Sequence, residues 1–140
     1  PVKASGKIFI AVPDRRLYAL DAATGKELRH YEKSAREAVG VSPDGKKVYC
    51  KSMWHTITSV DAASLEVDWC AETGAGYEIS PTSIVRIGNE VIMPTDKGNI
   101  IGFGAEDGSE SDGGLERRGS DLHSRLHNGR NSDIAAQIAA

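Results

Sequence analysis

The stretch Gly6-Lys-Ile-Phe-Ile returns twice along the chain, as Gly45-Lys-Lys-Val-Tyr and as Gly88-Asn-Glu-Val-Ile. A turn, a second short apolar stretch, another turn and a third such stretch follow each copy. The glycines that open the three copies are 39 and 43 residues apart. A period of this length indicates one supersecondary unit that is used about three times.

The apolar stretches have the composition of fully buried β-strands. Ile8-Phe9-Ile10-Ala11-Val12 is apolar on both faces, whereas a half-exposed strand alternates between apolar and polar residues. Between residues 1 and 112 no segment of ten or more residues shows the helical period, which excludes the crossover helices of a parallel α/β sheet. Blades of a β-propeller are small sheets covered on both faces and repeat every 40–45 residues or so. The sequence therefore predicts an all-β fold, a partial β-propeller of about three four-stranded antiparallel blades.

Turn residues set the expected boundaries of the blades. Proline presets φ and glycine supplies positive φ, so Pro13-Asp14 and Ser42-Pro43-Asp44-Gly45 are expected to be turns. The blades are expected near 6–36, 37–78 and 79–112, with a Gly-rich linker and tail over 113–140. The expected strands are 6–12, 17–22, 26–32, 37–42, 47–51, 56–61, 67–71, 79–87, 90–94 and 99–104. The tail is expected to be poorly structured, or to form a short helix over 133–140 that Ser132 caps.

Composition and charge exclude several classes of protein. The chain has 140 residues, of which 39% are hydrophobic and 26% are charged, and no apolar run approaches the ~18 residues of a transmembrane helix. The net charge is −3 and the longest basic group is the pair Arg117-Arg118, which argues against nucleic acid as a partner. Pro1 is not an initiator residue, so we expect that a leader was removed or that the chain was cut from a longer one.

Two cysteines are expected to remain unbridged. Cys50 ends the second strand of the middle unit and Cys70 lies on its fourth strand. Strands two apart in a sheet are roughly 9–10 Å from each other, beyond the ~7 Å between Cα atoms that a disulfide spans. The absence of a paired C-x-x-C spacing also disfavours a metal site at these residues.

The segment Leu17-Tyr-Ala-Leu-Asp-Ala-Ala-Thr-Gly-Lys26 resembles the PQQ-like β-propeller repeat, whose signature is Ala-x-Asp-x-x-Thr-Gly followed by a tryptophan. The acid of the signature, Asp21, can accept the N–H groups of the turn, and Thr24-Gly25 makes the reversal. The tryptophan of the signature is a large apolar body that fills the gap between blades.

The other two units match the signature with departures. The second has Asp61 and Trp69 in place but Leu65 where the glycine belongs, and the third has Gly108 but Gly104 where the acid belongs. The signature tryptophan is replaced by Arg29 in the first unit and by Asp112 in the third. We expect that the third blade does not complete its outer strand. Asp21, Thr24, Gly25, Asp61, Trp69 and Gly108 are the expected structural positions of the repeat.

The resemblance covers residues 6–112 and implies several functions. The family includes cofactor-bound alcohol dehydrogenases, the lipoprotein scaffold of outer-membrane assembly, and accessory domains beside phosphoesterases or kinases. Dehydrogenases of the family hold their cofactor with adjacent cysteines, which this chain lacks, so no cofactor and no catalytic residue is expected. The hypothesis is a non-catalytic binding or scaffolding module, periplasmic or at the cell surface. The alternative is an accessory propeller segment of a larger bacterial enzyme, a dehydrogenase or phosphoesterase, whose active site lies outside this chain.

Three blades do not close a ring, because propellers usually have four to eight. A protein partner or self-association is therefore expected, for instance two chains that complete six blades; whether a small molecule binds is left open.

Trp54, with His55, is the candidate for binding, because an aromatic residue in a hairpin tip is often exposed and anchors partners. A role in the core is the equally common alternative. His123 and His127 have the spacing of two ligands on one helical face, but Ser124 stands where a zinc hydrolase has glutamate. A solvated polar tail is the commoner reading, so no metal site is expected.

Overall fold

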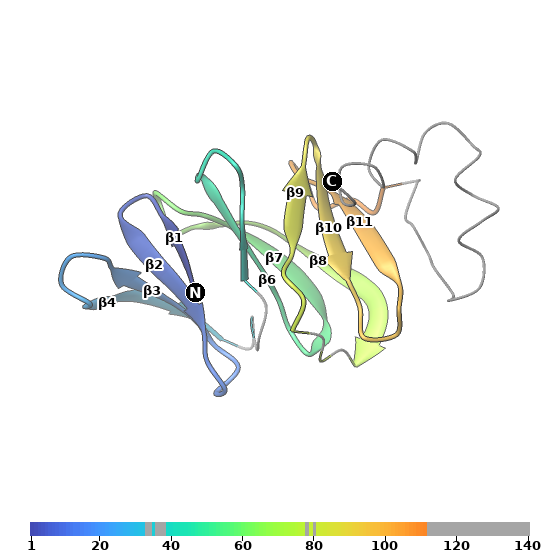
Figure 1. The fold of residues 1–140 in the computed structure, drawn as a ribbon, viewed down its shortest axis with the longest axis horizontal. Coiled ribbons are helices and arrows are strands. Elements are labelled where there is room, and N and C mark those ends of the chain that lie inside the picture. The colour runs from blue at the N-terminus through green and yellow to red at the C-terminus, as the bar shows by residue number, and fades with distance from the viewer. Residues whose placement is uncertain (33–34, 36–38, 78, 80, 112–140) are drawn as a thin grey trace.

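The computed structural model describes residues 1–32, 35, 39–77, 79 and 81–111, and over these residues the protein is all-β. Three antiparallel sheets stand side by side in a row, as Figure 1 shows. The first is β1(Val2–Ala4)-β2(Lys7–Ala11)-β3(Leu17–Asp21)-β4(Glu27–Tyr31), and the second is β5(Val39–Val41)-β6(Lys47–Lys51)-β7(Trp54–Asp61)-β8(Val67–Tyr77). The third sheet has β9(Val85–Ile87), β10(Glu90–Pro94) and β11(Ile100–Gly104), with β10 in the middle. We call them blades 1, 2 and 3. The predicted fold, a partial propeller of about three antiparallel blades, is confirmed.

The three blades are built in the same register. Their second and third strands pair identically, with Ile8 opposite Leu20, Val48 opposite Val60 and Val91 opposite Phe103. The turn after the third strand closes with one hydrogen bond of 2.8 Å, from the N–H of Gly25, Leu65 or Gly108 to the carbonyl of Asp21, Asp61 or Gly104. The residues of these two strands therefore have defined counterparts in the next blade.

Two apolar layers hold the blades together, one between each pair of neighbours. The first layer contains Phe9, Leu17 and Ala19 of blade 1 against Val48 and Val60 of blade 2, all fully buried. The second layer joins blade 2 to blade 3 and contains Tyr49, Ile57, Trp69, Val91, Met93 and Phe103. Blade 2 is therefore buried on both faces, which explains why its strands are apolar on both faces.

Some strands differ from the prediction. Blade 1 begins before Gly6, since Val2–Ala4 forms β1, a strand too short to show a pattern. The expected strand 79–87 is reduced to Val85–Ile87. The fourth strand of blade 2 runs on to Tyr77 instead of ending at residue 71, because Gly74 and Gly76 adopt positive φ within the strand instead of breaking it.

The third blade can be followed to Ser111. Glu110 forms an isolated bridge with Phe103, and the N–H of Ser111 donates to the carbonyl of Gly102 at 3.1 Å. Asp112, the linker, both tail histidines and the expected short helix lie outside the described residues, and so does the outcome for the outer strand of this blade. Nowhere in the described part of the chain is there a helix that could cross a membrane.

Candidate functional site: an exposed aromatic pair

Trp54 and His55 begin strand β7, which starts two residues before the expected strand 56–61. The chain reverses tightly here because the Ser52 hydroxyl accepts the N–H groups of Trp54 and Thr56, at 3.2 and 3.3 Å, and lies 2.7 Å from the Thr56 hydroxyl. The N–H of Ser52 also donates to the carbonyl of Thr56 at 2.9 Å. His55 takes up the reversal with a φ of 66°, a left-handed conformation that is uncommon outside glycine.

This turn holds the Trp54 indole out of the core, with 52% of the residue exposed. Strand β8 brings Tyr77 opposite Trp54, and the two rings meet edge to face with 5.1 Å between their centroids. Tyr77 is itself 44% exposed, and the centroid of the His55 ring lies 6.5 Å from that of the indole. We call Trp54, His55 and Tyr77 the aromatic surface.

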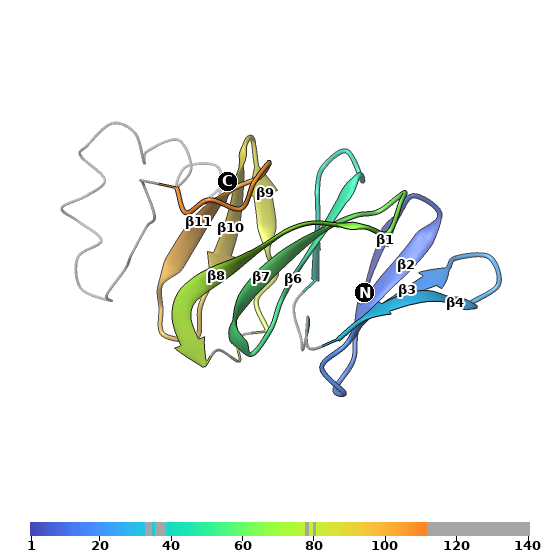
Figure 2. The same cartoon turned by 180° about the vertical axis from the view of Figure 1, so that it is seen from behind.

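The end of β8 that carries Tyr77 is attached to blade 3. The Lys97 ammonium, from the turn between β10 and β11, donates to the carbonyl of Ala75. Lys51, which is 4% exposed, donates to the carbonyl of Pro94 at 3.2 Å. Figure 2 shows how β8 curves toward blade 3 at this end. The aromatic surface therefore lies on a support held by two blades and not on a free hairpin.

The sequence did not indicate Tyr77 as a partner of Trp54, because the expected strand ends at residue 71 and two glycines, Gly74 and Gly76, follow it. Only the alternation of side chains along a longer strand, which puts Ala75 and Tyr77 on one face, could have indicated it.

The acids of the repeat are engaged in turns. Asp21 Oδ1 accepts the N–H of Ala23 at 3.0 Å, and the N–H and hydroxyl of Thr24 at 2.8 and 2.9 Å. These bonds hold the pKa of Asp21 below its usual range. Asp61 accepts the N–H of Ser64 and a bond from Lys47, and these partners lower its pKa to about 2.

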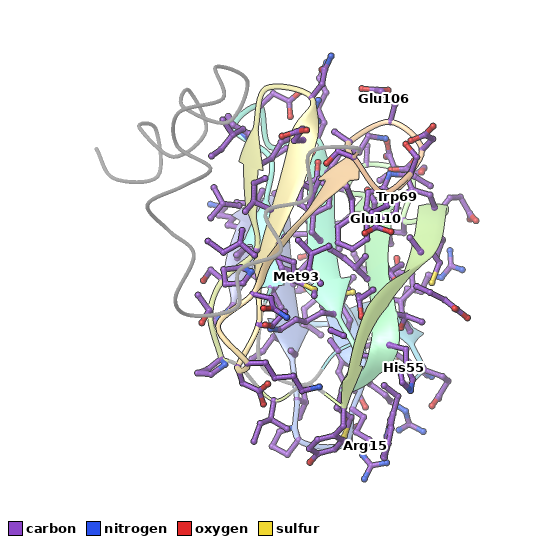
Figure 3. All side chains as sticks on the ribbon, turned by 90° about the vertical axis from the view of Figure 1, so that its right-hand side faces the viewer. Arg15, His55, Trp69, Met93, Glu106 and Glu110 are labelled. Atoms are coloured by element: carbon purple, nitrogen blue, oxygen red, sulfur yellow. The ribbon has the colours of Figure 1, made fainter. Side chains whose placement is uncertain are left out.

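Trp69 lies toward the other end of strand β8 from Tyr77, and Figure 3 shows it well above His55 in that view. Its Nε1–H donates to the carbonyl of Ala105 at 3.0 Å, and its ring is 6.3 Å from that of Tyr49. The indole covers Gly108 so closely that a Cβ there would be 2.4 Å from Cε3. Trp69 and Gly108 thus form the joint between blades 2 and 3.

The joint between blades 1 and 2 uses different residues at the same positions. Arg29, in the place of the tryptophan, donates to the carbonyl of Leu65 at 2.6 Å and pairs with Glu66 at 3.1 Å. The Tyr31 hydroxyl donates to the same carbonyl at 2.6 Å. Leu65 replaces the glycine, keeps a positive φ of 66°, and packs against the layer between these blades.

The two cysteines are free thiols, both opposite Thr58 on the strand between them. Cys50 is buried and its pKa is raised to about 12 by loss of solvation, so it remains a protonated apolar group.

Within residues 1–32, 35, 39–77, 79 and 81–111, titratable side chains gather on blade 1, where His30 lies 2.7 Å from Glu27 and 3.3 Å from Glu32, and Arg16 lies 2.9 Å from Glu32. No cluster of three or more histidine, cysteine or acidic side chains there could hold a metal ion. A cavity of about 110 Å³ lies between β8 and β11, lined by Thr73, Ala75, Asn99, Ile101 and Glu110 among others. This volume is below the ~300 Å³ at which pockets for drug-sized molecules begin.

Comparison with known proteins finds propellers of this repeat. The sequence model of a family described as outer membrane protein assembly factor BamB matches residues 1–136. The quinoprotein glucose dehydrogenase of Escherichia coli (strain K12) is 25% identical over 108 residues, which are 77% of this chain and 11% of that protein.

Solved structures agree in fold. BamB from Moraxella catarrhalis superposes with a TM-score of 0.64 at 17% identity, covering 76% of this chain and 31% of that one. The quinohemoprotein alcohol dehydrogenase ADHIIG from Pseudomonas putida HK5 gives a TM-score of 0.64 at 20% identity, covering 79% of this chain and 19% of that one. The chain therefore spans a third or less of the relatives it matches.

Proposed function

Since the chain belongs to the family described as outer membrane protein assembly factor BamB, we propose that it is a non-catalytic binding or scaffolding module. The observation that carries this proposal is the aromatic surface, an edge-to-face pair of half-exposed rings on a support held by two blades. Aromatic residues dominate the energetics of protein interfaces when a partner covers them. We propose a protein as the partner and a periplasmic or cell-surface location, which the family description supports.

The proposal is tested at Trp54. A photo-reactive amino acid in place of Trp54, in cells that express the chain, should give one major cross-linked protein. The matched control is Val85, which is 47% exposed on another blade and should not give that product. With the cross-linked partner purified, Trp54→Ala should weaken its binding by about thirtyfold or more, as truncation of an interface hot spot does, and Val85→Ala should not. Equal binding by both variants would show that the aromatic surface does not bind this partner.

The match to a quinoprotein glucose dehydrogenase favours one alternative, an accessory propeller segment of a larger enzyme. In that case the active residues lie outside this chain. Reading the coding sequence on both sides separates the two: a cofactor- or metal-binding block supports the enzyme, and further blades alone support the binding module. Turnover of an alcohol or sugar by this chain with added quinone would contradict both.

A further inference from the structure

The aromatic surface presents two rings that meet at an angle. The planes of the Trp54 and Tyr77 rings are inclined by 65°, with 5.1 Å between their centroids, and both residues are about half exposed. Figures 1 and 2 show the end of β8, which carries Tyr77, beside the turn that joins β6 to β7. Because one ring meets the other with its edge, the pair leaves aromatic faces open, and a ligand group can contact both rings at once.

Both rings carry a hydrogen-bond donor that is free. In the part of the chain that the structure describes, the Trp54 indole N–H and the Tyr77 hydroxyl have no hydrogen-bond partner, since the bond from Trp54 to Ser52 uses the backbone N–H. Trp69 is the contrast, because its indole N–H donates to the carbonyl of Ala105 at 3.0 Å. The aromatic surface therefore suits a ligand that brings apolar groups for the ring faces and acceptors for the two donors.

The exposed area of the aromatic surface is small. Trp54 and Tyr77 are 52% and 44% exposed, and a large aromatic side chain covers about 150–250 Å² when it is fully buried, so the two expose about 200 Å² together. Ser52 and Met53, which precede Trp54, are each 7% exposed and add little. A stable interface between two folded proteins buries about 800 Å² on each partner. The aromatic surface alone therefore fits a short segment of a partner, and not a folded domain or a second copy of this chain.

The charge at the aromatic surface disfavours a cationic ligand. Among the described residues, no carboxylate is bonded to Trp54, His55 or Tyr77, so an ammonium group over the rings lacks a neutralising partner. Protonation of His55 adds a charge of the same sign. A sugar is also a poor ligand, because two donors leave most of its hydroxyl groups without a partner.

We infer that the aromatic surface binds a proline-rich segment of the partner in the polyproline II conformation. Proline places an apolar ring against the aromatic faces, and its carbonyl accepts a hydrogen bond while it has no N–H to satisfy. Such a segment is already extended before it binds, so a small surface can hold it at a low cost in chain entropy. This rests on the proposed function and names the chemistry of the partner.

Octaproline with blocked ends is the probe, and the readout is the pair of indole N–H signals in the nuclear magnetic resonance spectrum, since the chain has two tryptophans. The Trp54 signal should shift and saturate with a Kd on the order of 1 mM or tighter. The Trp69 signal should not shift, because that indole is 8% exposed and bonded to Ala105. A blocked peptide of alternating glycine and serine of the same length offers the same carbonyls without the proline rings, and it should bind at least about tenfold more weakly.

Two variants separate the ring contacts from the hydrogen bond. Tyr77→Phe keeps the ring and removes the hydroxyl, so the Kd for octaproline should rise about three- to tenfold. Trp54→Ala removes a ring and its donor, and the Kd, followed through the backbone amide signal of Tyr77, should rise at least about tenfold. Val85→Ala is the matched control, since Val85 is 47% exposed on blade 3, and it should bind octaproline as the original chain does.

An unshifted Trp54 signal at about 5 mM octaproline, or equal affinity for the glycine–serine peptide, would overturn the inference. So would a shift that tetramethylammonium or glucose causes and octaproline does not, because the surface would then bind a cation or a sugar.

These failures are distinct from a failure of the proposed function. A purified partner that binds the chain, and that octaproline does not displace, overturns the inference and leaves the binding module intact. The absence of any protein cross-linked through position 54 contradicts the proposed function itself.

Discussion

Adding one methyl group at Gly108 should destabilise the protein far more than adding it at Gly25. Alanine at either position must adopt a left-handed conformation, with φ of 70° at Gly108 and 72° at Gly25, which lowers the free energy of unfolding by roughly 1–2 kcal/mol. At Gly108 the new Cβ would also be 2.4 Å from Cε3 of Trp69, a distance that forces the ring or the turn to move. Overpacking of this kind costs about 1–3 kcal/mol, so Gly108→Ala should lose about 2–5 kcal/mol in total.

Gly25→Ala is the matched control, because the hydrogen bond that closes the turn and the φ are the same, and no indole lies over the glycine. Urea unfolding followed by tryptophan fluorescence measures both variants. A Trp54→Phe background makes Trp69 the sole reporter, since the chain has two tryptophans. In Gly108→Ala the emission of the folded protein should also shift to the red, because a displaced indole meets more water.

Equal losses for the two alanine variants would refute the argument, since the contact with Trp69 would then add nothing beyond backbone strain. A larger loss for Gly108→Ala with unchanged Trp69 emission would mean that the turn moves and the ring does not. The joint between blades 2 and 3 would then be adjustable, contrary to the packing described above.

Three further outcomes are expected. Leu65→Gly should be more stable to urea than Leu65→Ala by about 1 kcal/mol, since both lose the side chain but only glycine accepts a φ of 66° without strain; the reverse order would contradict this. The pKa of Asp61 is lowered from 3.8 to about 2, so its stabilisation is complete above pH 4 and is lost as the pH falls toward 2. In Asp61→Asn the melting temperature should therefore depend less on pH between pH 4 and pH 2 than it does in the original protein. The same pH dependence in both proteins would contradict this prediction. Tyr31→Phe should cost about 0.5–1.5 kcal/mol in urea unfolding by removing the 2.6 Å bond to the Leu65 carbonyl, and no loss would mean that water replaces it.

The repeat made the fold predictable from the sequence. The candidate site was harder to predict, because it depends on features that only one blade has. Strand type and antiparallel pairing followed from turn residues and apolar runs, which recur with nearly constant spacing. The sequence predicted only one member of the exposed aromatic pair. Trp54 was a binding candidate, but Tyr77 was not, because it follows glycines that normally end a strand. The ring contact depends on the reversal at Ser52 and on the length of β8, which are tertiary features that a local pattern does not encode.

The departures from the repeat signature occur in pairs, one residue on each of two neighbouring blades. This pairing explains how the blades still pack against each other. Trp69 requires Gly108, because no Cβ fits beneath the indole. Where the tryptophan is replaced by Arg29, the glycine is also replaced, and Leu65 fills the layer while its carbonyl receives the guanidinium. Each joint is thus a two-residue unit shared by neighbouring blades, so a substitution on one blade is judged by the residue on the next. Swapping both members together, as Trp69→Arg with Gly108→Leu, should cost less than the sum of the single changes, because the double variant recreates the native joint between blades 1 and 2.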